Sequence, residues 1–223
     1  QKHDLNLVLQ KRYALLNWQQ GSGKTAAVYH RAKYLLKFRK AKNVIILAPA
    51  IATNMTWIPF LTINKERFRT IQTAGDLNNI PEGTFLVVST SMLRKLKRGL
   101  MRFVKRTSGK LCLVFDESDE ITNPTSQRTR NILCIFRRLR YKILDTGTTT
   151  RNNIAELYSQ FELLYNNSVN MICWSPQVYH ENRDHEIEEE NNPDYGTPFP
   201  AFRGHVLFRA CHCPGKATVF GIE

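Results

Sequence analysis

The chain has 223 residues, 42% of them apolar, which is enough for one well-packed domain with an appendage but too short for two full α/β lobes. Its apolar runs stay below the ~18 residues of a membrane span and its first residues lack a secretion signal, so we expect no membrane partner and no export. The formal net charge of +13 predicts a polyanionic partner, with nucleic acid as the first candidate and a merely basic protein as the alternative.

Short apolar runs alternate with longer amphipathic runs along residues 12–164, a pattern typical of a mostly parallel sheet with helices on both faces. The predicted strands are residues 13–16, 44–47, 68–72, 85–89, 111–115 and 142–144. The predicted helices are residues 24–38, 52–61, 91–105, 126–139 and 153–165. This order predicts a doubly wound α/β lobe, in which ligands lie at the carboxyl ends of the strands.

The alternation ends near residue 165, so we expect one domain at residues 1–165 and an appendage, or the start of an inter-lobe region, at residues 166–223. The acidic stretch 181–194 is typical of a solvated loop, with a docking site as the alternative. Cys211-His212-Cys213 could bind zinc, but the spacing is poor and a strand with both cysteines on one face is the alternative. The odd number of cysteines, five, predicts reduced thiols and a cytoplasmic location, or a nuclear one in a eukaryote.

A glycine-rich loop separates the first predicted strand from the first predicted helix, which is the context that a phosphate-binding loop requires. Backbone N–H groups of such a loop surround the phosphates of ATP, Lys24 reaches the β- and γ-phosphates, and the Thr25 hydroxyl binds Mg²⁺. Trp18 departs from the pattern at its first position, where glycine or alanine is usual. The residues expected to bind the nucleotide are Gln20, Gly21, Ser22, Gly23, Lys24, Thr25 and Ala26.

Two carboxylates follow the apolar run 111–115 directly, at the carboxyl end of a predicted strand. In a P-loop enzyme such a pair divides its work, so Asp116 is expected to hold Mg²⁺ and Glu117 to polarise the attacking water. The alternative is a helix N-cap and first turn, where acidic residues are also favoured. Together with Lys24, the pair makes up the predicted catalytic set.

Four blocks of sequence resemble motifs of Swi/Snf-type ATPases of helicase superfamily two, in the right order. Residues 115–124 resemble the Asp-Glu-Ala-His block with its trailing Lys-Asn-Pro, here Thr-Asn-Pro, and residues 146–159 are similar to the third motif, with Thr149 in place of its proline. Ala48-Pro49 followed by Trp57 resembles the motif after the second strand, and residues 88–91 resemble the next one. The resemblance covers residues 1–164 and implies a RecA-like P-loop NTPase lobe, the first of two.

The resemblance implies ATP hydrolysis coupled to stepping along duplex DNA, with a second lobe in the same polypeptide that supplies arginine fingers. Without that lobe we expect this chain to bind ATP but hydrolyse it poorly. The residues that the resemblance implies for coupling are Asp119, Thr146, Gly147 and Thr148. Gln1 matches the family's adenine-reading glutamine, with an ordinary helix-start residue as the alternative.

Asp119 replaces the family's usual histidine and resembles related RNA helicases, so an RNA helicase lobe is one alternative function. A non-hydrolysing basic nucleic-acid-binding module is the other. Basic runs at residues 33–42, 94–110 and 128–142 fit solvated helix surfaces as well as a binding face. We expect phosphate contacts, without sequence preference, from hydroxyl-bearing residues after the strands, namely Thr53, Ser89, Thr90 and Ser91.

Overall fold

A computed structural model describes residues 6, 8–9, 11–19, 21–107, 109–148, 156–165, 208, 217–218 and 221–222. Gln1, Gln20, Thr149 and the cysteine and histidine cluster at residues 211–213 lie outside the described residues. The same holds for most of the predicted appendage and for the start of the last predicted helix. The two-domain division therefore stays a prediction.

Six parallel strands form one sheet in the order β1-β6-β5-β2-β4-β3, which confirms the predicted α/β lobe. A separate antiparallel pair, β7–β8, joins two-residue strands near the end of the chain. The strands are β1 (Tyr13–Asn17), β2 (Asn43–Ala48), β3 (Phe68–Thr70), β4 (Phe85–Ser89), β5 (Leu111–Phe115), β6 (Tyr141–Thr146), β7 (Ala217–Thr218) and β8 (Gly221–Ile222).

The helices alternate with the strands as the sequence predicts, but the second predicted helix contains a π-helical turn. The regular helices are α2 (Lys24–Lys37), α3 (Ala50–Ala52), α4 (Ile58–Ile63), α5 (Leu93–Arg106), α6 (Gln127–Phe136) and α7 (Leu157–Tyr165). The π-helical turn is η1 (Thr53–Trp57), and the 3₁₀ turns are η2 (Ala74–Leu77), η3 (Thr90–Met92) and η4 (Ser118–Ile121). The backbone stays helical from α3 through η1 into α4, so the three elements form one continuous helical segment.

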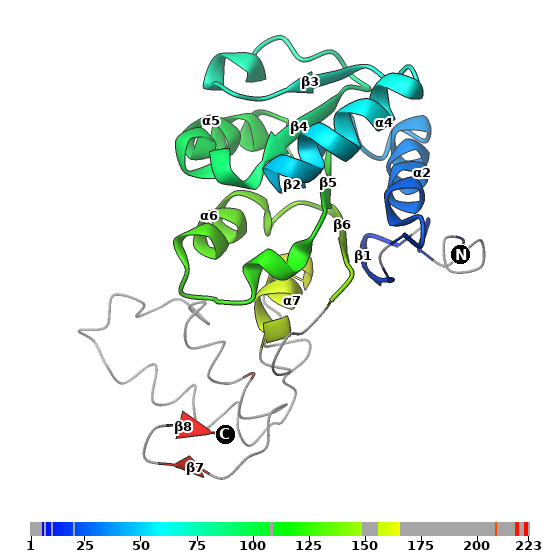
Figure 1. Ribbon diagram of the computed structural model, residues 1–223. Coiled ribbons are helices and arrows are strands. Elements are labelled where there is room, and N and C mark those ends of the chain that lie inside the picture. The colour runs from blue at the N-terminus through cyan, green and yellow to red at the C-terminus, as the bar shows by residue number, and fades with distance from the viewer. Residues whose placement is uncertain are drawn as a thin grey trace.

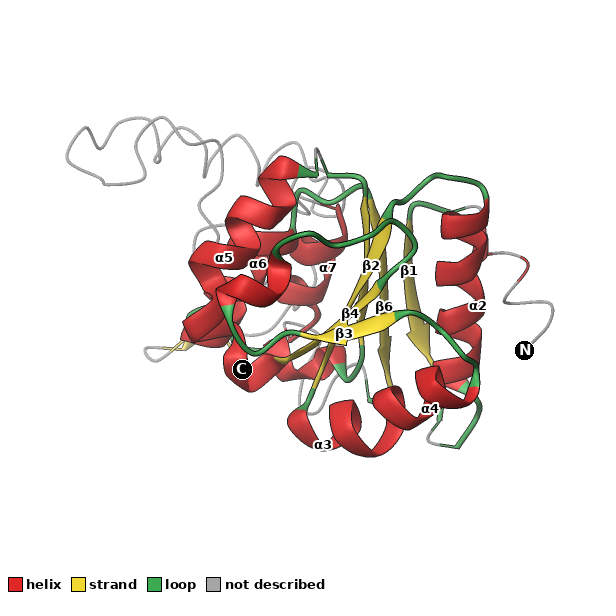
Figure 2. Ribbon diagram, turned by 90° about the horizontal axis from the view of Figure 1, so that it is seen from above, coloured by secondary structure: helices red, strands yellow, loops and turns green. Residues whose placement is uncertain are grey.

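Helices cover both faces of the sheet and make three layers (Figures 1 and 2). The helices α5, α6 and α7 pack on one face, and α2 and α4 pack on the other. Successive residues of β2 serve the two faces, because Ile45 packs with the first group of helices and Val44 and Ile46 with the second. Burial of an apolar side chain of this size contributes about 1.5–3 kcal/mol, so the central strands anchor both layers.

The strand order determines which chain segments meet at the carboxyl edge of the sheet. β6 lies between β1, which leads into the glycine-rich loop, and β5, which leads into Asp116. In register, Leu16 pairs with Asp145 and Phe115 pairs with Leu144. The ends of β1, β6 and β5 are therefore neighbours at this edge.

Within the described residues, no helix has both the length and the apolar character needed to cross a membrane.

Candidate functional site

The glycine-rich loop joins β1 to α2 at the carboxyl edge of the sheet. Gly21 and Gly23 have φ angles of 74° and 83°, which side chains with a Cβ rarely adopt. No side chain of the described residues caps the start of α2, so its first backbone N–H groups point into the loop without a side-chain acceptor. The loop thus has the backbone conformation and the helix N-terminus that bind a phosphate group.

Lys24 begins α2 and its side chain turns back over the loop. Its Nζ donates to the carbonyl oxygen of Trp18 at 3.0 Å. Burial raises the pKa of the carboxyl groups of Glu117 and Asp145, and the Lys24 ammonium group is close enough to both to oppose that rise. Lys24 therefore lies at the same edge as the carboxylates that follow β5 and end β6. Thr25 follows it on the first turn of α2 and is half-buried.

Asp116 follows β5 and accepts a hydrogen bond from a side chain of the π-helical turn η1. Its Oδ2 accepts a hydrogen bond of 2.7 Å from Nε1 of Trp57, and its backbone N–H donates to Leu47. Asp116 is buried at 8% exposure and Trp57 is fully buried. Sequence reasoning noted Trp57 as part of a motif but did not select it as a site residue. The signal was present, since a buried indole N–H needs an acceptor.

Glu117 adopts a left-handed backbone conformation, with a φ of 54°. For a residue other than glycine this conformation costs about 1–3 kcal/mol and is concentrated at functional sites. Burial raises the pKa of its carboxyl group, as do Asp116 and Asp119, while Lys24 and a hydrogen bond from the Gly147 N–H oppose the rise. Glu117 precedes η4, but its side chain makes no capping hydrogen bond, so the helix-cap alternative is not favoured.

The predicted coupling residues lie together at the ends of β5 and β6. The Thr146 hydroxyl is 3.2 Å from Oδ1 of Asp119 and 2.9 Å from the carbonyl oxygen of Thr148, and its single proton can serve one of these acceptors. The Thr148 N–H in turn donates to Thr146 Oγ1 at 3.0 Å. The backbone N–H of Gly147 donates a hydrogen bond to the Glu117 carboxylate. The structure thus connects these residues to the carboxylates, while their part in coupling stays a prediction.

Asp145 is a site residue that sequence reasoning missed. It belongs to β6, is 1% exposed, and neither carboxylate oxygen has a hydrogen-bond partner in the part of the chain that the structure describes. Burial raises the pKa of this carboxyl group well above its usual value, nearby Asp116 adds to the rise, and Lys24 opposes it. The signal in the sequence was an acidic residue directly after the predicted strand 142–144, as Asp116 directly follows the predicted strand 111–115.

The residues predicted to contact nucleic acid follow β2 and β4 at the same edge of the sheet, but they differ in exposure. Thr53 and Thr90 are buried, and the Thr53 hydroxyl lies 3.5 Å from the carbonyl oxygen of Ala48. Ser89 is half-buried and Ser91 is exposed, with their hydroxyl oxygens 2.8 Å apart. Ser91 is therefore the most accessible of the four, and contact with nucleic acid stays a prediction for all of them.

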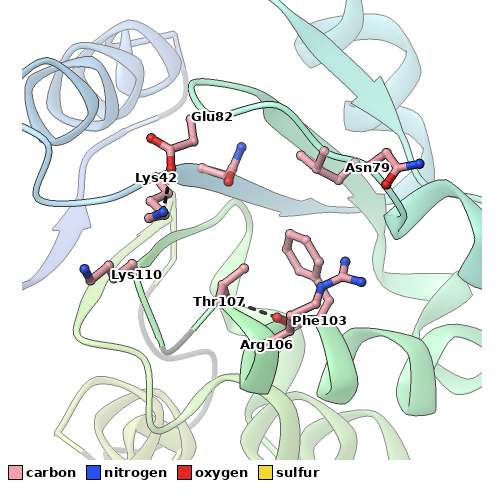
Figure 3. Close-up of a pocket in the computed structure, with 9 residues that line it drawn as sticks. Lys42, Asn79, Glu82, Phe103, Arg106, Thr107 and Lys110 are labelled. Atoms are coloured by element: carbon pink, nitrogen blue, oxygen red, sulfur yellow. Dashed lines mark hydrogen bonds and ion pairs between the residues drawn. The ribbon is translucent and has the colours of Figure 1, made fainter.

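A pocket of about 490 Å³ lies at the opposite edge of the sheet, where Lys42 and Lys110 precede β2 and β5 (Figure 3). Lys42 forms an ion pair with Glu82, and Arg106 donates to the carbonyl oxygen of Leu77 at 2.7 Å. Lys42 and Arg106 thus have partners within the chain. The pocket is separate from the phosphate loop, because the two lie at opposite ends of the parallel strands.

The described ranges contain no group of three or more histidine, cysteine, aspartate or glutamate side chains placed to hold a metal. The zinc candidate at residues 211–213 lies outside those ranges.

A glycine-rich loop after β1 at the carboxyl edge of a parallel sheet, with two acidic residues directly after β5, which is separated from β1 by β6 alone, is the arrangement of a RecA-like P-loop NTPase lobe. The chain belongs to the family described as "Type III restriction enzyme, res subunit", whose model matches residues 2–151. It is also 27% identical, over 175 residues, to "ATP-dependent helicase FUN30" of Saccharomyces cerevisiae. This match covers 73% of this chain and 15% of that protein.

Two solved structures from Sulfolobus solfataricus share the fold. One is described as "SWI2/SNF2 ATPase core in complex with dsDNA", with a TM-score of 0.55, 16% identity, and coverage of 96% of this chain and 40% of that one. The other, "SWI2/SNF2 ATPase core domain", has a TM-score of 0.54, 17% identity, and coverage of 93% and 40%. The comparisons together confirm the predicted Swi/Snf-type resemblance and the RecA-like fold.

Proposed function

We propose that this chain is the ATP-binding first lobe of a motor that couples ATP hydrolysis to movement on duplex DNA. The observation that carries the proposal is the meeting of three separate segments at one edge of the sheet. Lys24 acts electrostatically on Glu117, and Glu117 accepts a hydrogen bond from Gly147. Lys24 follows β1, Glu117 follows β5 and Gly147 follows β6. A nucleotide bound at Lys24 would therefore change the electrostatic surroundings of Glu117 and, through it, act on the segment that follows β6.

The residues present fit ATP and Mg²⁺. The left-handed glycines and the uncapped start of α2 suit phosphate oxygens, and Lys24 now donates to a backbone carbonyl that a phosphate oxygen would replace. Thr25 and Asp116 would hold Mg²⁺, which when bound neutralises charge on the phosphates. Gln1, Gln20 and residues 21–26 complete the proposed nucleotide site, with Gln1 at the adenine.

Glu117 is the residue that we assign to the attacking water. Its carboxylate would accept a hydrogen bond from that water and orient it toward the γ-phosphate. Burial raises the pKa of Glu117, which makes its carboxylate a better proton acceptor. The hydrogen bond from Gly147 holds the carboxylate in place, and it also couples any movement of Glu117 to the Thr146 segment.

A second lobe in the same polypeptide would complete the site. The chain spans 15% of the length of the curated relative that it matches and 40% of each similar structure. Arginine fingers are worth about three to five orders of magnitude in turnover, so we expect weak hydrolysis by this lobe alone. The proposed location is the cytoplasm, or the nucleus in a eukaryote.

We propose duplex DNA as the nucleic acid along which the motor moves, because the chain is strongly basic and because one similar structure is described as a complex with duplex DNA. The net charge is +13, and the exposed cations of α5 include Arg94, Lys95, Arg98 and Arg102. One similar structure is described as a complex with double-stranded DNA. Asp119 favours an RNA helicase lobe as the second candidate, because it resembles the residue found in those enzymes. ATPase stimulation of the full polypeptide by duplex DNA, but not by RNA, would support the first candidate over the second.

ATP binding by this chain tests the proposal directly. Calorimetric titration with MgATP should show one site, and Lys24→Ala should weaken it at least about 100-fold because a charge-assisted phosphate contact is lost. Lys42→Ala is the matched control, since Lys42 lies at the opposite edge of the sheet. Equal MgATP affinity in wild type and Lys24→Ala would overturn the proposal.

A further inference from the structure

A buried carboxyl group at the end of β6 has no role in the chemistry described so far. Asp145 is 1% exposed, and both of its oxygens lack a hydrogen-bond partner within the described residues. Its carboxyl group lies within hydrogen-bonding reach of Asp116. Two ionised carboxylates only accept hydrogen bonds, so this pair can be joined only by a shared proton or a shared cation.

The surroundings of Asp145 carry more negative than positive charge. Asp116 and Glu117 both act on it as like charges, and Lys24 is the cation that acts on it. Lys24 forms no hydrogen bond with it, because neither Asp145 oxygen has a partner among the described residues, and the Lys24 Nζ donates to the Trp18 carbonyl instead. A buried carboxylate without a partner is costly, and proteins keep such groups mainly where they bind a cation or do chemistry.

Strand order explains why Asp145 is central. β6 lies between β1 and β5, and Asp145 pairs in register with Leu16, near the end of the strand that leads into the phosphate loop. The neighbouring acids have contacts of their own, because Asp119 lies 3.2 Å from the Thr146 hydroxyl and Glu117 accepts from Gly147. Asp145 is the carboxylate placed between the loop and Asp116.

We propose that Asp145 is a second carboxylate ligand of the nucleotide-associated Mg²⁺, acting beside Asp116 either directly or through a water molecule. This inference rests on the proposed function. Mg²⁺ prefers oxygen ligands and is commonly held by one or two carboxylates together with phosphate oxygens and water. Asp116 and Asp145 would supply the two carboxylates, and Thr25, phosphate oxygens and water the other positions.

The test compares ATP affinity in Mg²⁺ with ATP affinity in EDTA, by calorimetric titration of wild type and Asp145→Asn. Asparagine keeps the shape but is a weaker metal ligand, so MgATP affinity should fall about tenfold or more. Metal-free ATP should bind equally well or more tightly, because a negative charge beside the triphosphate is gone. The ratio of the two affinities should thus fall. An unchanged ratio, as expected of a neutral carboxyl group or of general damage to the fold, would overturn the inference.

Control variants separate this inference from the proposed function. Asp116→Asn should lower the ratio, and Glu82→Gln, at the opposite edge of the sheet, should leave it unchanged. If Asp116→Asn lowers the ratio while Asp145→Asn does not, the inference fails and the proposed function stands. If wild type binds no ATP, both fail. Asp145→Ser, with a smaller side chain, replaces Asp145→Asn if that variant does not fold.

Discussion

Trp57 Nε1 donates a 2.7 Å hydrogen bond to Oδ2 of Asp116 and so joins the π-helical turn η1 to the end of β5. Both side chains are buried, and a hydrogen bond to a charged group contributes about 1.5–3 kcal/mol. π-Helical turns are rare and frequently occur at functional sites. Here the turn carries the indole that orients the proposed magnesium ligand.

Removal of this indole N–H should weaken MgATP binding. Trp57→Phe keeps an aromatic ring but frees the Asp116 carboxylate to rotate, so MgATP affinity should fall about tenfold, as for other groups that orient metal ligands. Affinity for ATP in EDTA should not change. Tyr29→Phe is the control, because it removes a 2.6 Å hydrogen bond to Glu66 elsewhere on the same face of the sheet. A loss of affinity that is equal with and without Mg²⁺ would contradict the assigned role.

Glu117→Gln should separate binding from hydrolysis. The glutamine carbonyl can still accept from the Gly147 N–H, so MgATP affinity should stay within about threefold of wild type. The amide cannot take a proton, so single-turnover ATP hydrolysis should slow by about two to four orders of magnitude. Radiolabelled ATP with protein in excess measures the rate. Hydrolysis at the wild-type rate would assign the water to another residue.

The contact between Asp119 and Thr146 should appear as an interaction energy in a double-mutant cycle. Both residues are buried, so Thr146→Val and Asp119→Ala should each lower the free energy of unfolding by about 1–3 kcal/mol. The double variant should lose less than their sum, by about 0.5–1.5 kcal/mol, as measured by urea denaturation. Thr62→Val, which removes an exposed hydroxyl on α4, should change stability by less than about 0.5 kcal/mol. Strict additivity would show that the contact contributes no stability.

Lys142 should make stability depend on pH. Burial lowers the pKa of its ammonium group from 10.5 to about 7, while Glu162 opposes the shift. Between these values the unfolded chain binds more protons than the folded chain, so the free energy of unfolding rises with pH, by up to about 1.4 kcal/mol per pH unit. Below about pH 7 both states are protonated and this contribution to the slope disappears.

Urea denaturation at several pH values from 7 to 8.5 measures that slope. Lys142→Met should reduce it, whatever its effect on absolute stability, since the Arg137 and Leu163 carbonyls lose their ammonium donor. Lys95→Met, at an exposed position on α5, is the control and should keep the wild-type slope. An identical slope in wild type and Lys142→Met would contradict the lowered pKa of Lys142.

Binding to duplex DNA should depend steeply on salt and little on sequence. Contacts between exposed cations and phosphates release counterions, so about six contacts would reduce affinity roughly 1,000-fold between 50 and 200 mM salt. Fluorescence anisotropy with two unrelated duplexes of equal length measures both properties. An affinity that ignores salt, or that differs strongly between the duplexes, would argue against contacts with the phosphate backbone.

Much of the fold and part of the site could be predicted because they depend on local patterns. The run 111–115 is apolar at every position and ends in Asp116, so both the strand and the carboxylate at its end were evident. Gly21 and Gly23 likewise marked the loop before α2, because left-handed backbone conformations favour glycine. These features lie within a few residues of one another in the chain.

Asp145 and Trp57 show what the sequence by itself left open. It determined the class of fold, the phosphate loop and the carboxylates after β5, because glycines, apolar periodicity and strand ends act over short stretches of chain. Only the tertiary structure decided that β6 lies between β1 and β5 and that η1 directs an indole at Asp116. Strand order and long-range hydrogen bonds arise from packing between distant segments. No local pattern specifies which buried neighbour a side chain will meet.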